Sequence, residues 1–167
     1  MIVREMSGEE CRGLLARAEY GRLATVHQDQ PYIVPIYFAY DRDYLYGFTT
    51  LGRKVEWMRA NPLVCVEVDD VVSHFHWSSV VVLGHYEELP DTPVYRDVRL
   101  QTQVRLERRV LWWQTAYAAG QVRGGFQPAD ALFYRIHIDQ ITGRRATPDP
   151  VESAVGLSSA ARPAREK

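Results

Sequence analysis

Six stretches of this chain are rich in β-branched and aromatic residues, and short polar segments separate the first three of them. Stretches of this composition and length are typical of β-strands. The first three follow one another closely, as expected for a meander of antiparallel strands. The six predicted strands cover residues 21–26, 31–40, 44–50, 63–70, 77–89 and 131–143.

The second of these strands is apolar on both of its faces, because Tyr32, Val34 and Ile36 alternate with Ile33 and Pro35. A strand covered on one side only would show polar alternation, so we expect this one to be buried on both sides. A barrel whose outer surface is covered by a helix or by a partner subunit would bury it in this way. Pro35 has no N–H to donate, which indicates an edge, a bulge or an interruption of the strand.

Helical patterns precede, interrupt and follow these strands. Ser7 and Glu10 form a capping-box signature before an amphipathic segment, so we predict a helix over residues 8–19. A second short helix starts near Gly52 and stops before Pro62. The composition of residues 91–119 favours one long or two short further helices. The predicted fold class is mainly β (α+β), a barrel with flanking helices.

Length and charge limit the remaining possibilities. A chain of 167 residues suits one domain, which we assign to residues 1–145, and the Pro-, Ala- and Ser-rich residues 146–167 are expected to form a disordered tail. A formal net charge of −1 gives no basic field for nucleic acid. No stretch has the length of a membrane span and no signal peptide is present, so we expect a cytoplasmic protein without a membrane partner. Cys11 and Cys65 are expected to be buried reduced thiols.

The stretch FTTLGRK, residues 48–54, carries the clearest candidate chemistry. A strand ends there in two hydroxyl residues, turns at Gly52, and presents Arg53 and Lys54 at the start of a helix. Hydroxyl groups, backbone N–H groups and cations at a helix N-terminus are suited to bind a phosphate. No Walker-type loop is present, so a monophosphate fits this stretch better than a triphosphate.

The order of these segments, from GRLATV through PYIVPIYFAY and FTTLGRKVEWMRANP to WSSVVVLGHYEEL, resembles the pyridoxamine 5′-phosphate oxidase-related FMN-binding split β-barrels over residues 5–145. The similarity is greatest to the subgroup that includes nitroimidazole-resistance reductases. It implies a six-stranded antiparallel split barrel with flanking helices, a homodimer, and FMN bound in a cleft between the subunits. The residues that the resemblance assigns to the cofactor are Val34, Pro35, Ile36, Thr49, Thr50, Arg53, Lys54 and Ser79.

The chain also departs from this family's pattern. The Arg and His cluster with which true pyridoxamine-phosphate oxidases recognise their substrate is replaced by ITGRRAT, which argues against vitamin B6 oxidation. Some nitroimidazole-resistance members carry a His where this chain has Arg53. We therefore expect an FMN-dependent oxidoreductase acting on a small aromatic or nitro-aromatic substrate, and we assign no catalytic residue and no metal site.

Three alternatives remain open from the sequence. Related split barrels bind or degrade haem, and His74, His76 or His85 could then serve as axial ligands. A deazaflavin could use the same phosphate site. The protein could also bind a flavin without turning over, since one fold hosts many functions.

Overall fold

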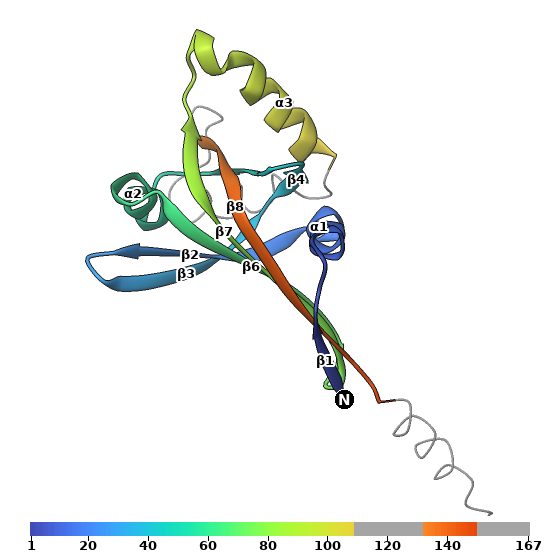
Figure 1. Cartoon of the computed structure of the whole chain (residues 1–167). Coiled ribbons are helices and arrows are strands. Elements are labelled where there is room, and N and C mark those ends of the chain that lie inside the picture. The colour runs from blue at the N-terminus through green and yellow to red at the C-terminus, as the bar shows by residue number, and fades with distance from the viewer. Residues whose placement is uncertain (109–131, 150–167) are drawn as a thin grey trace, which may run out of the picture.

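The computed structural model of the protein describes residues 1–108 and 132–149. Within these residues, eight strands form one sheet, and three α-helices and a short 3₁₀ helix accompany it (Figure 1). The elements in chain order are β1 (Ile2–Glu5), α1 (Gly8–Arg17), β2 (Tyr20–His27), β3 (Gln30–Tyr37), β4 (Ala39–Asp41), β5 (Tyr44–Thr49), α2 (Arg53–Ala60), β6 (Leu63–Ser73), β7 (His76–Leu89), η1 (Pro93–Tyr95), α3 (Arg96–Glu107) and β8 (Leu132–Thr147).

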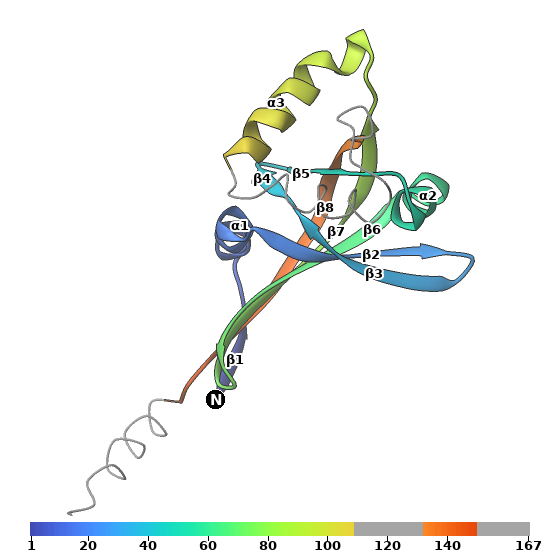
Figure 2. The same cartoon turned by 180° about the vertical axis from the view of Figure 1, so that it is seen from behind.

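All the strand pairs are antiparallel, and seven of the strands follow the order β3-β2-β6-β7-β8-β5-β4. The two ends of this order, β3 and β4, are consecutive in the chain and meet at Phe38. The sheet therefore curls round until its ends join through the backbone, as the views from opposite sides show (Figures 1 and 2). This closure is the split barrel that the sequence predicted.

The strand count is higher than the six predicted, for two local reasons. The predicted strand 31–40 is divided at Phe38, so that its first part pairs with β2 and its last part with β5. The N-terminal strand β1 was not predicted; it pairs with the end of β8, where Ile2 lies opposite Thr147. Consequently β8 continues two residues beyond Arg145, where the sequence had placed the start of the tail.

The helix boundaries agree with the prediction to within a few residues. The first helix ends at Arg17 rather than at residue 19, because Ala18 is extended (φ −69°, ψ 139°). In the third helical region, η1 and α3 account for residues 93–107. The predicted helical residues 109–119 and the predicted tail from residue 150 onward lie outside the described residues.

The barrel interior and the inner faces of α1 and α2 form one hydrophobic core. Leu15 of α1 and Val55 and Met58 of α2 are fully buried, together with Leu23 of β2 and Val66 of β6. Cys11 is buried in this core as expected, whereas Cys65 is only half-buried, and both are free thiols. The core therefore holds α2, and with it the stretch FTTLGRK, firmly against the barrel.

The outer face of β3 differs from the prediction that this strand is buried on both sides. Ile33 is 64% exposed and Tyr37 is 39% exposed, so the prediction is wrong for the single chain. The described helices pack elsewhere, and nothing in this chain covers that face among the described residues. β3 is an edge strand, as Pro35 indicated.

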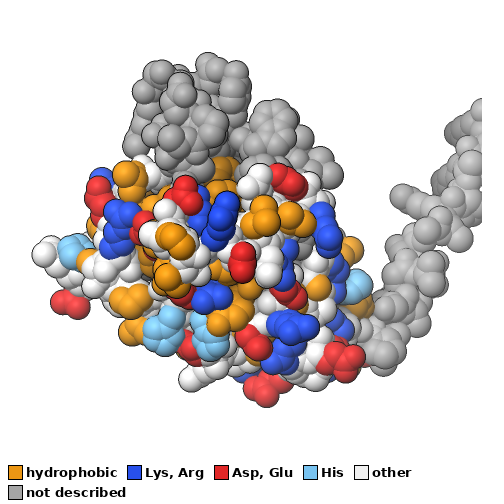
Figure 3. Space-filling view, turned by 90° about the horizontal axis from the view of Figure 1, so that it is seen from above, with side chains coloured by type: hydrophobic (Ala, Val, Ile, Leu, Met, Phe, Trp, Pro, Cys, Tyr) orange, Lys and Arg blue, Asp and Glu red, His pale blue; other side chains and the backbone are white. Residues whose placement is uncertain are grey.

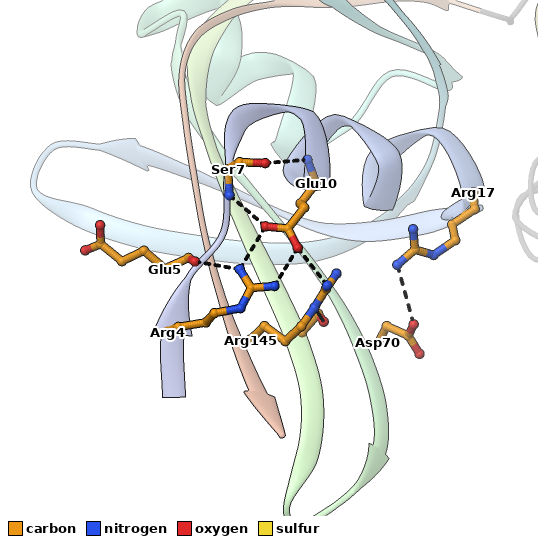
Figure 4. Close-up of polar contacts among 8 residues, drawn as sticks. Arg4, Glu5, Ser7, Glu10, Arg17, Asp70 and Arg145 are labelled. Atoms are coloured by element: carbon orange, nitrogen blue, oxygen red, sulfur yellow. Dashed lines mark hydrogen bonds and ion pairs between the residues drawn. The ribbon is translucent and has the colours of Figure 1, made fainter. Parts of the chain in front are cut away.

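The start of α1 is tied to both ends of the chain's described part by charged side chains (Figure 4). The Glu10 carboxylate accepts hydrogen bonds from the Arg4 guanidinium at 2.6 and 2.8 Å and from Arg145 Nη1 at 2.8 Å. Ser7 Oγ accepts from the Glu10 N–H, and the Ser7 N–H donates to Glu10 Oε2, which completes the predicted capping box. Arg4 and Arg145 belong to β1 and β8, so Glu10 joins three elements.

Charged side chains of both signs are interspersed with apolar ones on the face seen from above (Figure 3). This mixture accords with the formal net charge of −1. Among the described residues, no helix combines the length and the apolar character that crossing a membrane requires.

Candidate functional site

The start of α2 is the first part of the candidate site. The chain leaves β5 at Thr49 and reaches α2 through Gly52, which is extended (φ 167°) and offers no side chain to cap the helix. The N–H groups of Val55 and Glu56 donate to the Gly52 carbonyl. The first N–H groups of a helix have no partner within the helix, so the first turn of α2 can donate them to a bound group.

The two cations of this turn have no carboxylate partner among residues 1–108 and 132–149. Within the described residues, neither Arg53 nor Lys54 lies within 4.0 Å of an Asp or Glu oxygen, whereas Arg59 on the same helix is paired with Glu88 at 2.7 Å. Lys54 is half-buried, and this burial lowers the pKa of its ammonium group. It is also the only lysine of the described residues. Within the part of the chain that the structure describes, positive charge is thus concentrated at the start of α2 without a compensating carboxylate.

The two threonines that precede this turn are placed as the sequence predicted. Thr49 is the last residue of β5 and Thr50 follows it, and both are half-buried. The Thr49 hydroxyl donates to the Thr50 carbonyl oxygen at 3.3 Å, a long contact that a better acceptor would displace. Thr49, Thr50, Arg53 and Lys54 therefore lie on one connection, between the end of β5 and the start of α2.

Three aromatic side chains lie beside these cations, and the sequence reasoning did not assign them to the site. The Arg53 guanidinium carbon lies 5.7 Å from the centre of the Tyr32 ring. The Tyr32 ring is 5.4 Å from the Trp57 ring, and the Trp57 ring is 5.7 Å from the His27 imidazole. We call these four side chains the aromatic ladder. The spacing of Arg53 and Trp57, four residues apart on α2, was the sequence signal that places both on one helix face.

The predicted main-chain segment Val34, Pro35 and Ile36 lies on β3, a few residues along the strand from Tyr32. Pro35 is opposite Arg22 of β2, and because β3 is an edge strand its other edge is not paired with another described strand. Val34 is half-buried, Pro35 exposed and Ile36 buried. The segment can therefore offer main-chain groups along an open edge.

Ser79 is not brought to the same place within one chain. Its hydroxyl donates to Glu67 at 2.9 Å, and Glu67 in turn accepts from Arg22 at 3.0 Å. These side chains point outward from the sheet, whereas His27 lies on the face of β2 that carries the buried Leu23. His27 is also five residues along β2 from Arg22, a distance of about 16 Å. Ser79 of β7 thus contacts side chains on the outer face near the start of β2, whereas the aromatic ladder lies on the other face at the end of β2.

Two open grooves of about 600 Å³ lie away from α2. One, of about 610 Å³, runs between β1, β7 and β8 and is lined by Ser79, Trp77 and Arg144 among others. The second, of about 630 Å³, lies between α3 and β4. Neither is lined by Arg53 or Lys54. The first groove therefore places Ser79 beside a ligand-sized space that is separate from the start of α2.

The histidines considered as haem ligands are dispersed. His74 and His76 are exposed at the turn between β6 and β7, and His74 contacts Phe75 edge to face. His85 Nδ1 of β7 instead contacts the Asp139 carboxylate, which also contacts His137 Nδ1 at 2.8 Å. In the part of the chain that the structure describes, no three His, Cys, Asp or Glu side chains have an arrangement that could hold a metal ion.

Comparison with known proteins gives a family match over most of the chain. A family model described as pyridoxamine 5′-phosphate oxidase matches residues 7–145. An uncharacterized protein of Rhizobium meliloti (strain 1021) is 38% identical over 154 residues, which are 87% of this chain and 97% of that protein.

The solved structures agree with this match. A FAD-binding protein from Mesorhizobium loti is 41% identical and superposes with a TM-score of 0.74, covering 88% of this chain and 100% of that one. A candidate 5-nitroimidazole antibiotic resistance protein from Bacteroides thetaiotaomicron is 20% identical with a TM-score of 0.62, covering 87% of this chain and 89% of that one. At this lower identity, the second structure supports the fold alone.

Proposed function

Because the chain belongs to the pyridoxamine 5′-phosphate oxidase family, we propose that it binds a flavin and holds the flavin 5′-phosphate, as in FMN, at the start of α2. Arg53 and Lys54 would bind the phosphate oxygens, with help from the hydroxyls of Thr49 and Thr50. The Mesorhizobium loti protein, at 41% identity, is described as FAD-binding, which favours a flavin over the haem or deazaflavin alternatives.

The observation that carries the proposal is the positive charge at the start of α2, which no carboxylate of the described residues compensates. A half-buried ammonium group without a carboxylate costs free energy, and here burial lowers the pKa of Lys54 accordingly. A bound dianion would remove that cost, and the bidentate geometry of a guanidinium suits phosphate oxygens. The residues present therefore fit a phosphate-bearing cofactor.

A bound flavin supplies the redox chemistry, and the protein supplies binding, orientation and electrostatics. Val34, Pro35 and Ile36 would line the ring system through main-chain groups on the open edge of β3. No side chain of this chain needs to act as acid or base in such a protein. We propose an oxidoreductase that passes electrons from a nicotinamide donor to a small aromatic or nitro-aromatic acceptor.

We further propose that the protein is a homodimer that uses the outer face of the sheet. Six large apolar side chains of β2, β3, β6 and β7 are at least 39% exposed on this face: Tyr20, Val26, Ile33, Tyr37, Leu63 and Leu83. Such a surface is typical of a protein–protein interface. A second copy packed there could also bring its own Ser79 toward a flavin held by Arg53. Light scattering on the purified protein tests this, and a monomer at all concentrations would contradict it.

The cofactor proposal is tested by titrating the protein with FMN and with riboflavin, which lacks the phosphate. We expect FMN to bind far more tightly, and R53A/K54A to lose about 3 to 6 kcal/mol of that affinity, at 1.5 to 3 kcal/mol for each charge-assisted contact. Arg59→Ala is the matched control, because Arg59 is on the same helix but is already paired with Glu88. Equal affinity for FMN in R53A/K54A and wild type would refute the phosphate assignment.

Turnover needs a separate measurement. Stopped-flow absorbance after mixing the flavin-loaded protein with NADH or NADPH is expected to show bleaching of the flavin bands. If the flavin stays oxidised with either donor in excess, the protein is a flavin-binding module for those donors rather than an enzyme. A single intense Soret band in the purified protein would replace the flavin proposal with the haem alternative.

A further inference from the structure

The groove between β1, β7 and β8, which we call the β7–β8 groove, is a ligand-sized space apart from the start of α2. Its volume is about 610 Å³, and its lining includes Glu5, Trp77, Ser79 and Arg144. Small-molecule sites in proteins have volumes of this order. β1 lies beside the ends of β7 and β8 at the far end of the sheet from α2 (Figure 1). The groove is therefore considered separately from the phosphate position of the same chain.

The pairing register places the charged and aromatic side chains of the β7–β8 groove on one face of the sheet. Arg144 of β8 lies opposite Glu5 of β1 on one side and opposite Ser79 of β7 on the other. Trp77 is two residues before Ser79, so it shares this face and is the diagonal neighbour of Arg144. Diagonal neighbours are within reach of aromatic and long side chains. One bound molecule can therefore contact the Trp77 indole and the Arg144 guanidinium together.

The Arg144 guanidinium is held only loosely by the chain. Its Nη2 lies 3.5 Å from Glu5 Oε1, and the two side chains are 64% and 82% exposed. The next residue, Arg145, instead donates to Glu10 at 2.8 Å and to Ser78 at 3.0 Å on the opposite face. An exposed ion pair contributes little free energy, so a carboxylate with better geometry can replace Glu5.

Two other carboxylates lie on the same face of the sheet, and both are already paired. Glu67 accepts from the Ser79 hydroxyl at 2.9 Å and from Arg22 at 3.0 Å. Asp69 accepts from the same Arg22 guanidinium at 2.8 Å. Neither of these acids is among the residues that line the groove. The positive charge that faces the groove is therefore that of Arg144.

We propose that the β7–β8 groove binds an aromatic carboxylate, and that this is the class of acceptor on which the proposed oxidoreductase acts. The ring would stack on the Trp77 indole and contact the half-buried Val81 and Ile141, while the carboxylate would pair with Arg144. The inference rests on the proposed function, because the proposed homodimer would bring Ser79, and with it this groove, toward a flavin held by a second copy.

The electron balance is that of the proposed nicotinamide donor. For a nitro-substituted acceptor, NADH and a proton supply two electrons and two protons, the nitro group becomes a nitroso group, and NAD⁺ and water are released. The carboxylate of the acceptor takes no part in this step and serves binding alone. The proposal can therefore be tested by binding, without turnover.

Calorimetric titration of the purified, flavin-loaded protein with 4-nitrobenzoate, nitrobenzene and 4-nitrobenzylamine tests the inference. The three probes share a nitrophenyl ring and are an anion, a neutral molecule and a cation at neutral pH. We expect 4-nitrobenzoate to bind about tenfold more tightly than nitrobenzene, as a charge-assisted contact would give, and the cation to bind most weakly. Equal affinities for the three probes, or tightest binding of the cation, would overturn the proposal.

Arg144→Gln identifies the charge that the carboxylate meets. It is expected to lower the affinity for 4-nitrobenzoate about tenfold and to change the affinity for nitrobenzene by less than about twofold. Arg17→Gln is the matched control, because Arg17 is also an exposed arginine in a loose ion pair, 3.8 Å from Asp70, but on α1. An unchanged affinity for 4-nitrobenzoate in Arg144→Gln would refute the assignment.

Trp77→Leu identifies the ring contact. It is expected to lower the affinity for 4-nitrobenzoate and nitrobenzene about two- to tenfold, and to change that for cyclohexanecarboxylate, which has no aromatic ring, by less than about twofold. Phe75→Leu is the control, because Phe75 is an exposed aromatic residue at the nearby β6–β7 turn. An equal loss for cyclohexanecarboxylate would count against stacking, and a circular-dichroism melt that matches wild type shows that the fold is kept.

Failure of this inference is distinguishable from failure of the proposed function. If FMN binds and R53A/K54A weakens it, but 4-nitrobenzoate does not bind, the flavin site stands and the groove assignment is wrong. If 4-nitrobenzoate binds the flavin-free protein through Arg144 but FMN does not bind, the groove is an aromatic-carboxylate site and its role as an acceptor site is wrong.

Discussion

The starts of α1 and α2 differ in how their charges are balanced. At α1, Ser7 caps the helix, and the Glu10 carboxylate accepts hydrogen bonds from Arg4 and Arg145 (Figure 4). At α2, Gly52 provides no cap, and Arg53 has no carboxylate within 4.0 Å among the described residues. Both helices pack on the same core, so packing does not explain the difference. The charges at the first start are balanced by described side chains, whereas those at the second are not balanced by any described carboxylate, which accords with the proposed anion site.

Under the proposed function, this contrast separates residues that serve stability from residues that serve binding. Changes at the start of α1 should lower the melting temperature and leave flavin affinity unaltered. Changes at the start of α2 should lower the flavin affinity without lowering the melting temperature of the flavin-free protein. Some of them should raise that melting temperature. The following predictions test that separation.

Gly52→Asp should have the largest effect, because it gives α2 a side-chain cap, as Ser7 gives α1, and places a carboxylate beside the proposed phosphate position. A Cβ at Gly52 would meet no atom within 4 Å, and an extended backbone accepts any residue. The new carboxylate is expected to weaken flavin binding by about 1 to 3 kcal/mol through repulsion of the phosphate. It should also stabilise the flavin-free protein by about 0.5 to 1 kcal/mol as a helix cap. Titration and thermal melting measure the two effects, and Gly52→Asn is the uncharged control.

Ser7→Ala should destabilise the protein by about 1 kcal/mol, the usual cost of losing an N-cap side chain. The Ser7 hydroxyl accepts the Glu10 N–H, and alanine would leave that donor to water. Chemical denaturation measures the loss, with Ser73→Ala, an exposed serine at the end of β6, as the control. A parallel loss of flavin affinity would break the separation of the two helix starts.

Lys54→Met should stabilise the flavin-free protein by about 0.5 to 1 kcal/mol, or roughly 2 °C in melting temperature. The sign follows from burial, which lowers the pKa of Lys54 in the folded state below its unfolded value. The charged form is therefore penalised on folding at neutral pH, and methionine removes this penalty. Flavin affinity should fall in the same variant. A lower melting temperature would show that Lys54 already has a stabilising role without ligand.

Replacing Glu10 at the start of α1 should change the pH dependence of the protein's stability. Hydrogen bonds from Arg4 and the Ser7 N–H lower the pKa of Glu10 to about 2. A carboxyl group with a lowered folded pKa stabilises the protein above its unfolded pKa and loses this contribution as pH falls toward the folded one. Glu10→Gln should thus melt below wild type at neutral pH, and the difference should shrink between about pH 5 and pH 2. A constant difference across that range would contradict the assignment.

The sequence predicted the fold class and the strand end, turn and helix start within FTTLGRK because both depend on local signals. Alternating apolar residues determine strands, and Ser7 with Glu10 determines the start of α1. The position of Ser79 could not be predicted, because its distance from Arg53 depends on which face of β7 points outward. The aromatic ladder was missed for a similar reason: Tyr32 and Trp57 are 25 residues apart and meet only when α2 packs against the β2–β3 hairpin. Predicting the closure of the sheet at Phe38 would have required knowing how every strand pairs.

The closure at Phe38 also bears on aggregation. An open sheet exposes two edges, and unpaired edges recruit strands from other chains. Here the two ends of the seven-strand order belong to one short stretch, β3 and β4, so both lie within a single segment of the sequence. Pro31 and Pro35 in β3 have no N–H to offer to an incoming strand. Replacing them would add N–H donors to the open edge of β3 and so favour intermolecular β-pairing, even though both prolines are exposed and neither contributes to the core.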